Sequence, residues 1–207
     1  YNAGSATNFS NHAYKMGPLH YGILERGCKT SSGSHIVMPA TIGSFSVCFG
    51  KITNHPDTTA FPFSYIIAYK PCIVPGRNIA TVGLYRDIRK WHKRDLRPQG
   101  TQKSIINFEW LSPFTAFELF RGKHNLKMLK KTCGVNSDSY IYKGYTIKAS
   151  NLDKGIRLYN IALHIYIGEM LKKAKLLDIF DKPLEQDSIN VWNDLGGLIL
   201  PDFEEHF

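Results

Sequence analysis

The chain has 207 residues, 43% of them apolar and 21% charged, so it is long enough to bury a core and its composition excludes a disordered protein. No run of about eighteen apolar residues occurs, which excludes a membrane-spanning helix. The first ten residues lack the charged and apolar regions of a signal peptide. The formal net charge of +9 favours anionic partners.

The four cysteines, at positions 28, 48, 72 and 133, form no Cys-x-x-Cys pair and have no histidine at zinc-finger spacing. Cys48 lies between Val47 and Phe49, and Cys72 precedes Ile73. Such apolar surroundings favour buried, reduced thiols over a disulfide framework. We therefore expect a cytoplasmic protein with no metal site.

The first seventy residues are rich in glycine and proline and contain no convincing helix. Apolar residues recur there every six positions, at Ile36, Ile42 and Cys48, and Ala40, Ser46 and Ile52 repeat the same interval. This spacing is typical of a left-handed parallel β-helix, with Ile36, Ile42 and Cys48 pointing into its interior. On spacing alone, an irregular antiparallel β domain is an equal alternative for residues 1–70.

The number of repeats is too small for a complete repeat fold, because one or two coils cannot bury their own core or protect their ends. The chain also begins with Tyr1 rather than Met. We therefore expect that it is a fragment and that further coils precede Tyr1.

Residues 71–104 are predicted to form a basic excursion, preceded by a short strand at Ser64–Tyr69. The segment Arg86–Arg97, here called the basic window, carries six basic residues against Asp87 and Asp95. One or two helical turns there could bind phosphate groups, with Trp91 stacking on an adenine or another base. A solvated surface is the alternative. The residues expected to bind phosphate in this segment are Arg89, Lys90, Lys93 and Arg94.

Residues 105–207 are predicted to form a helical cap with a small hairpin. Ser112 is a natural N-cap, with Pro113 at the first helical position and Gly134 at the end of the helix. Tyr140–Tyr142 and Tyr145–Lys148 flank a Lys-Gly turn that indicates the hairpin. Ser150 and Asp153 resemble a capping box for a helix to about Lys175, and a third helix is expected at Glu185–Leu195.

Several short phrases of the sequence resemble one bacterial family of unknown function, related to hexapeptide-repeat transferases. They are Asn11–Gly17, Arg26–Lys29, Pro39–Gly43, His55–Thr58, Phe61–Tyr65 and Val74–Gly76. The resemblance covers most of the chain and implies a left-handed β-helix followed by an α-helical cap. Better-known hexapeptide relatives are acyltransferases and sugar-nucleotide enzymes, usually trimers. The resemblance therefore implies acyl-CoA as a cofactor and a homotrimer.

The resemblance also directs attention to histidines, because imidazole titrates near neutrality and can take the proton of an attacking acceptor. His55, with Asp57 close enough in sequence to orient it, is the first candidate for a general base. His12 and His20 follow, with Asn11 and Lys15 as neighbouring substrate-binding groups. Structural roles on turns are the alternative for each of them.

The leading hypothesis is a hexapeptide-type transferase that moves an acyl group from acyl-CoA to a sugar or sugar-nucleotide acceptor. A non-catalytic sugar-nucleotide-binding or trimerisation module is the first alternative. Nucleic-acid binding through the basic window is the second, and it is the less favoured of the two. No membrane partner is expected.

Overall fold

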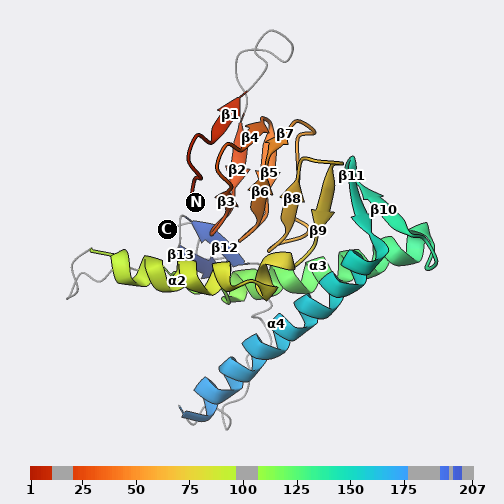
Figure 1. Cartoon of the computed structure of the whole chain (residues 1–207). Coiled ribbons are helices and arrows are strands. Elements are labelled where there is room, and N and C mark those ends of the chain that lie inside the picture. Colours follow the sequence, from red (N-terminus) through yellow and green to blue (C-terminus); the bar gives the residue numbers. More distant parts are fainter. Residues whose placement is uncertain (11–20, 97–106, 177–191, 196–197, 202–207) are drawn as a thin grey trace.

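The computed structural model describes residues 1–10, 21–96, 107–176, 192–195 and 198–201. Its N-terminal part consists of short strands that stack in parallel ladders (Figure 1). One ladder contains β1 (Asn8–Ser10), β4 (His35–Val37) and β7 (Lys51–Ile52). A second pairs β2 (Gly22–Leu24) with β5 (Ala40–Ile42). No strand of these ladders exceeds three residues.

The third ladder belongs to a six-stranded sheet in the order β10-β11-β9-β8-β6-β3. Its strands are β3 (Lys29–Thr30), β6 (Val47–Phe49), β8 (Tyr65–Ile67), β9 (Cys72–Val74), β10 (Ser139–Tyr142) and β11 (Tyr145–Lys148). β3, β6 and β8 are parallel, with Lys29 opposite Val47 and Val47 opposite Tyr65, eighteen residues apart each time. After β8 the chain reverses its direction, and β9 pairs with β8 antiparallel. The hairpin β10–β11 then joins β9.

This topology corrects the predicted fold class. The described residues form a mixed α/β arrangement of four small sheets and three α-helices, rather than a left-handed β-helix with a helical cap. The sheet also crosses the predicted boundaries at residues 70 and 104, since β9, β10 and β11 extend it. The six-residue spacing predicted which residues of the short strands face inward. It could not predict that β9 pairs antiparallel with β8 or that the hairpin β10–β11 joins the sheet, because these pairings do not depend on the spacing.

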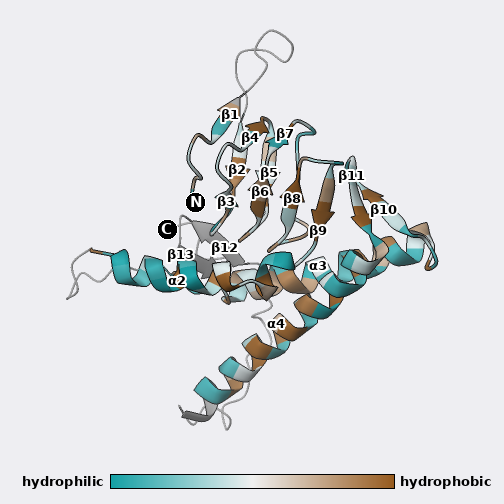
Figure 2. Cartoon of the chain, in the orientation of Figure 1, coloured by the Kyte–Doolittle hydropathy of each residue, from teal (hydrophilic) through white to brown (hydrophobic). Residues whose placement is uncertain are grey.

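The predicted inward placement of Ile36, Ile42 and Cys48 is confirmed, since all three side chains are buried in one apolar core. The rings of Phe45 and Phe63 stack in the same core, with centroids 5.0 Å apart. Brown, apolar residues accordingly lie along several of the strands in Figure 2.

The cysteines are free, but only Cys28 and Cys48 are buried. Burial raises the pKa of the Cys48 thiol to about 12 and that of Cys28 well above its ordinary value. Cys72 is half-buried and Cys133 is exposed, so the expectation of buried thiols holds for two positions.

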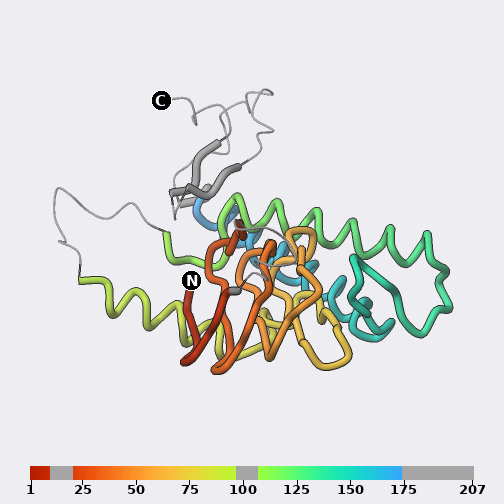
Figure 3. Tube along the Cα trace, turned by 90° about the horizontal axis from the view of Figure 1, so that it is seen from above, coloured from red at the N-terminus to blue at the C-terminus, as the bar shows by residue number. Residues whose placement is uncertain are grey.

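The described residues form three α-helices, α2 (Val82–Arg94), α3 (Pro113–Cys133) and α4 (Ala149–Leu176), with a 3-10 turn η1 (Arg77–Ala80) before α2. The predicted start of α3 is confirmed, because the Ser112 hydroxyl accepts from the Thr115 N–H and the Thr115 hydroxyl accepts from the Ser112 N–H. Seen from above, α3 runs along one side of the strands (Figure 3).

Two other helix predictions need correction. α4 begins at Ala149, whose N–H donates to the Asp138 carbonyl at 2.8 Å, so Ser150 lies inside the helix and is not its N-cap. Residues 192–195 of the expected third helix form a strand, β12 (Trp192–Leu195), antiparallel to β13 (Leu198–Pro201). The remainder of that predicted helix lies outside the described residues.

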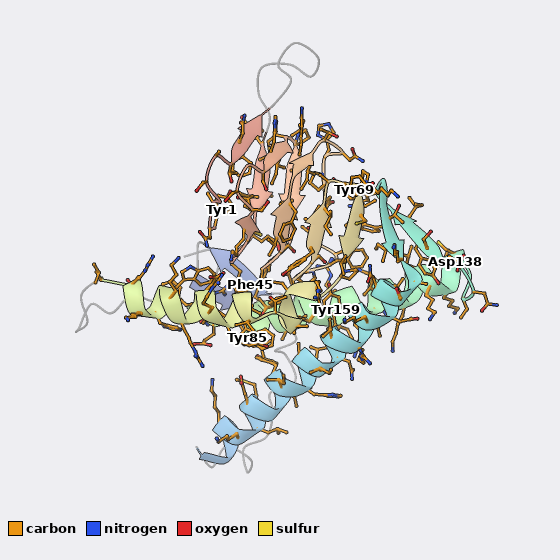
Figure 4. All side chains as sticks on the ribbon, viewed as in Figure 1. Tyr1, Phe45, Tyr69, Tyr85, Asp138 and Tyr159 are labelled. Atoms are coloured by element: carbon orange, nitrogen blue, oxygen red, sulfur yellow. The ribbon has the colours of Figure 1, made fainter. Side chains whose placement is uncertain are left out.

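Close packing joins α3 to α4 at a buried tyrosine. Tyr159 of α4 is fully buried, and its hydroxyl donates to the Pro62 carbonyl at 2.7 Å (Figure 4). Gly122 of α3 lets this ring approach, since a Cβ there would lie 2.9 Å from it. The contact fixes both helices against the turn between β7 and β8.

Candidate phosphate-binding site

α2 is amphipathic, and its inner face holds it against the strands. Leu84 and Ile88 are buried and Trp91 is half-buried, at the spacing of one helical face. Asp87, 3% exposed, lies on the same face and forms an ion pair with Lys29 of β3. A buried carboxylate needs such a partner, so this pair sets the position of α2 relative to the sheet.

The outer face of α2 carries the basic side chains. They border an open surface depression of about 400 Å³, and all are exposed: Arg86, Arg89, Lys90, Lys93 and Arg94. Positions three and four apart share one side of a helix, which explains why the five lie together. The end of α2 extends beyond the strands in Figures 1 and 3 and is strongly hydrophilic in Figure 2.

Little negative charge opposes this face. Arg86 Nε lies 3.6 Å from the Asp87 carboxylate, which is already paired with Lys29. Across the described ranges, the other four basic residues of the face form no ion pair. Like charges at neighbouring helical positions repel one another. An anion bound in the depression would relieve this repulsion, which is the electrostatic basis for a phosphate site.

Trp91 does not belong to this face, contrary to the predicted stacking role. Its ring packs against the core and lies 6.5 Å, between centroids, from the ring of Phe108. The neighbouring His92 points its Nε2 at Glu109, 3.0 Å away. The side chains that border the depression are therefore all cations.

His55, the histidine predicted as general base, lies in the connection between β7 and β8. His55 adopts a left-handed backbone conformation, with φ of 47°, and its Nδ1 lies 3.2 Å from the Pro39 carbonyl oxygen. A carbonyl accepts a hydrogen bond, so Nδ1 carries the proton in the neutral ring and Nε2 is the basic nitrogen.

Asp57 does not orient His55 as predicted. Its Oδ1 accepts hydrogen bonds from the Thr59 hydroxyl at 2.7 Å and the Thr59 N–H at 3.2 Å, and its Oδ2 accepts from Lys143. Burial would raise the pKa of the Asp57 carboxyl, but the hydrogen bonds from Lys143 and Thr59 outweigh it and lower that pKa. Asp57 therefore ties the His55 turn to the hairpin β10–β11.

Four other predicted site residues cannot be placed. Asn11, His12, Lys15 and His20 lie outside the described residues. Of the predicted binding residues, the structure brings together Arg89, Lys90, Lys93 and Arg94, and it adds Arg86.

Sequence reasoning missed Asp87 and Lys143 as organising residues. Asp87 carried a signal, since Leu84, Ile88 and Trp91 mark the inner face on which it falls. Lys143 carried none, because its partner Asp57 is 86 residues away in the chain.

A buried polar cluster also escaped prediction. The Ser44 hydroxyl lies 2.9 Å from the Glu25 carboxylate and 2.7 Å from that of Glu118, and the Ser44 N–H donates to Glu25 at 2.7 Å. Glu118 belongs to α3, so the cluster fastens this helix to the strands.

Among the residues that the structure describes, no three His, Cys, Asp or Glu side chains are grouped as a metal site would need. The helices of the described residues include none with the length and hydrophobicity of a transmembrane span.

Fold and surface together define a mixed α/β protein with an exposed basic helix. The chain belongs to the family described as "Domain of unknown function (DUF4954)", whose sequence model matches residues 1–130. This agrees with the resemblance to an uncharacterised family. Searches of curated proteins and of solved structures return no match.

Proposed function

We propose that this chain binds a phosphate-bearing ligand on the outer face of α2. The observation that carries the proposal is the depression bordered by five exposed cations, four of them without an ion pair across the described ranges. Arg offers a planar fork of donors for phosphate oxygens, and Lys offers a compact charge. The Asp87–Lys29 pair holds the helix in place while its outer face remains open to solvent.

The ligand class that fits is a nucleotide-type phosphate, as carried by acyl-CoA or a sugar nucleotide. The resemblance to hexapeptide-repeat transferases supports the same choice, since those enzymes use such compounds. Nucleic acid would also meet the charge requirement, but the five side chains that border the depression include no aromatic ring for stacking on bases.

Titration calorimetry with coenzyme A and a uridine-diphosphate sugar tests the proposal. Combined Arg89→Gln, Lys93→Gln and Arg94→Gln substitutions should weaken binding about tenfold or more, and parental affinity should fall as salt rises. The matched control removes the same charge from α3 through Arg121→Gln, Lys127→Gln and Lys131→Gln and should retain affinity. Equal affinity in the α2 variant and its parent would show that the cations of α2 do not bind the ligand, and it would contradict the proposal.

Acyl transfer to a sugar or sugar-nucleotide acceptor is the second candidate, and the geometry of His55 favours it. Its Nδ1 faces a carbonyl, which leaves Nε2 as the nitrogen able to take a proton from an acceptor hydroxyl. A strained backbone at a non-glycine residue is also typical of functional positions. His55→Ala should abolish transfer of a radiolabelled acetyl group while the far-ultraviolet circular dichroism stays unchanged. Undiminished transfer would contradict this role.

The alternative to acyl transfer is a non-catalytic sugar-nucleotide-binding or trimerisation module, with the chain assembled as a homotrimer. Light scattering on the chain would favour assembly if it gave a threefold mass. A monomer at micromolar concentration would count against the trimer and against any site shared between subunits.

A further inference from the structure

A second surface of the chain, separate from the cations of α2, lies on the C-terminal half of α4. This half runs away from the strands in Figure 1, and residues 158–168 contain no Asp, Glu, Lys or Arg. Its inner side is apolar, with Ala162 fully buried. Its outer side is apolar as well, with four exposed side chains: Ile161 (46%), Ile165 (39%), Ile167 (51%) and Leu171 (52%). A helix that is apolar on all sides is normally buried, so we expect another molecule to cover this outer face.

Gly168 lies on the same outer face, and packing within the chain does not explain it. A Cβ at Gly122 of α3 would lie 2.9 Å from Tyr159, and a Cβ at Gly155 of α4 would lie 2.9 Å from Pro75. At Gly168 an added Cβ would meet no atom within 4 Å. Glycine weakens the interior of a helix relative to alanine, so its presence on an open surface needs another reason. The missing side chain leaves room into which a side chain of a facing helix can pack.

The charges around this face indicate the chemistry of the molecule that covers it. Four exposed cations border the apolar stretch, two at each end: Lys154, Arg157, Lys172 and Lys173. Within the described ranges none of the four forms an ion pair. The acidic residues of α4 are Asp153, which pairs with Lys130, and Glu169. Two copies of α4 packed on this face would bring cations against cations in either orientation, so the charges favour an acidic partner over a second copy.

We propose that the outer face of α4 binds an amphipathic helix of a partner protein, with an apolar stripe at its centre and carboxylates at both ends. Arg157 and Lys172 are separated by about 22 Å along the axis of α4, so the partner helix needs about fifteen residues to reach both. One of its apolar side chains occupies the space over Gly168. An anionic membrane fits less well, because helices that lie on membranes present large apolar side chains where this face has a glycine.

Fluorescence anisotropy with two labelled model peptides tests the proposal on the whole chain. Both peptides are helical, about eighteen residues long, with one leucine stripe at helical spacing. One carries glutamates in its first and last turns, and the other carries lysines at the same positions. The acidic peptide should bind about tenfold or more tightly than the basic peptide, and this ratio should fall as salt rises.

Gly168→Leu fills the space on α4 and should weaken binding of the acidic peptide about tenfold. Because the new side chain meets open space, the far-ultraviolet circular dichroism should stay unchanged. The matched control is Gly83→Leu, the same substitution in α2, where a Cβ makes only an ordinary contact of 3.7 Å. This control should retain the affinity. The Arg89→Gln, Lys93→Gln and Arg94→Gln variant of α2 should retain it too, which separates this surface from the proposed phosphate site.

Five outcomes would overturn the proposal. The first two are absence of acidic-peptide binding at about 100 μM and equal binding of the two peptides. The third is unchanged affinity in Gly168→Leu, and the fourth is a loss of affinity in the α2 variant, which would place the peptide on α2. The fifth concerns other occupants: tighter binding to phosphatidylserine vesicles would assign the face to a membrane, and a dimer in sedimentation that Gly168→Leu dissociates would assign it to a second copy.

Discussion

The outer face of α2 and the turn that holds His55 are both polar surfaces, but they satisfy their charges differently. On α2, Arg89 and Lys93 have no ion-pair partner within the described ranges. At the turn, Asp57 is neutralised by Lys143 and further bonded to Thr59, and His55 itself is held by the Pro39 carbonyl. The cations on the outer face of α2 are therefore available to bind a ligand, whereas most polar groups of the His55 turn form hydrogen bonds or ion pairs within the protein.

The difference separates two roles that look alike in sequence. A polar group with an internal partner holds its segment in place, whereas like charges crowded on one face are stable only because solvent or a ligand screens them. Asp87 shows both roles on one helix, since it anchors α2 inward and leaves the cations outward. Three changes test this contrast, in descending order of expected effect.

Asp87→Asn should have the largest effect. The substitution leaves Lys29, 21% exposed, without its carboxylate, and we expect a loss of about 2 kcal/mol in the free energy of unfolding, less than for a fully buried pair. Urea denaturation measures this. Glu109→Gln breaks the exposed pair with His92 and should change stability by less than about 0.5 kcal/mol. Similar values for the two variants would contradict the anchoring role of Asp87.

Lys143→Met should have a smaller, pH-dependent effect. The pKa of Asp57 is below its ordinary value of 3.8, so its ionised form stabilises the fold above that pH, and this contribution is lost as pH falls through the lowered pKa. Because the pair is half-exposed, we expect a loss of about 0.5 kcal/mol near neutral pH and a smaller loss in acid well below 3.8.

Denaturant unfolding of the Lys143→Met variant at both pH values checks this prediction, with the exposed Lys127→Met on α3 as control. If the difference in the free energy of unfolding between variant and parent grew on acidification, the ion pair with Lys143 would not stabilise ionised Asp57 and the prediction would be wrong.

His55→Asn should change stability least, by less than about 0.5 kcal/mol. Asparagine adopts the left-handed conformation required at φ of 47°, and the hydrogen bond lost to Pro39 is exposed. Thermal unfolding measures the effect. A clear loss of stability would assign the ring to the fold. Unchanged stability combined with lost acyl transfer would assign it to catalysis.

Local signals in the sequence predicted two local elements, helix α3 and the hairpin β10–β11. Ser112, Pro113 and Gly134 define α3 because caps act through the nearest backbone groups. The hairpin around Lys143 and Gly144 follows from its turn residues in the same way. The start of α4 at Ala149 was missed because Asp138, across the hairpin, accepts its N–H.

The candidate site was predicted in part. The cluster of basic residues between Arg86 and Arg97 is visible in the sequence, but its division into two faces required the packing of Leu84, Ile88 and Trp91. This packing also places Trp91 against the core, which the sequence did not predict. The predicted Asp57–His55 pair failed because nearness in the chain does not determine where a carboxylate points, and Lys143 provided the stronger partner.

The sequence by itself determined the net charge of +9, the concentration of cations before Arg97, the caps of α3 and the inward positions Ile36, Ile42 and Cys48. Each of these depends on composition or on contacts within a few residues. Only the tertiary structure decided that β9 reverses against β8 and that the hairpin β10–β11 extends the sheet. It also decided that Asp87 meets Lys29, because pairing between distant segments depends on how the whole core closes.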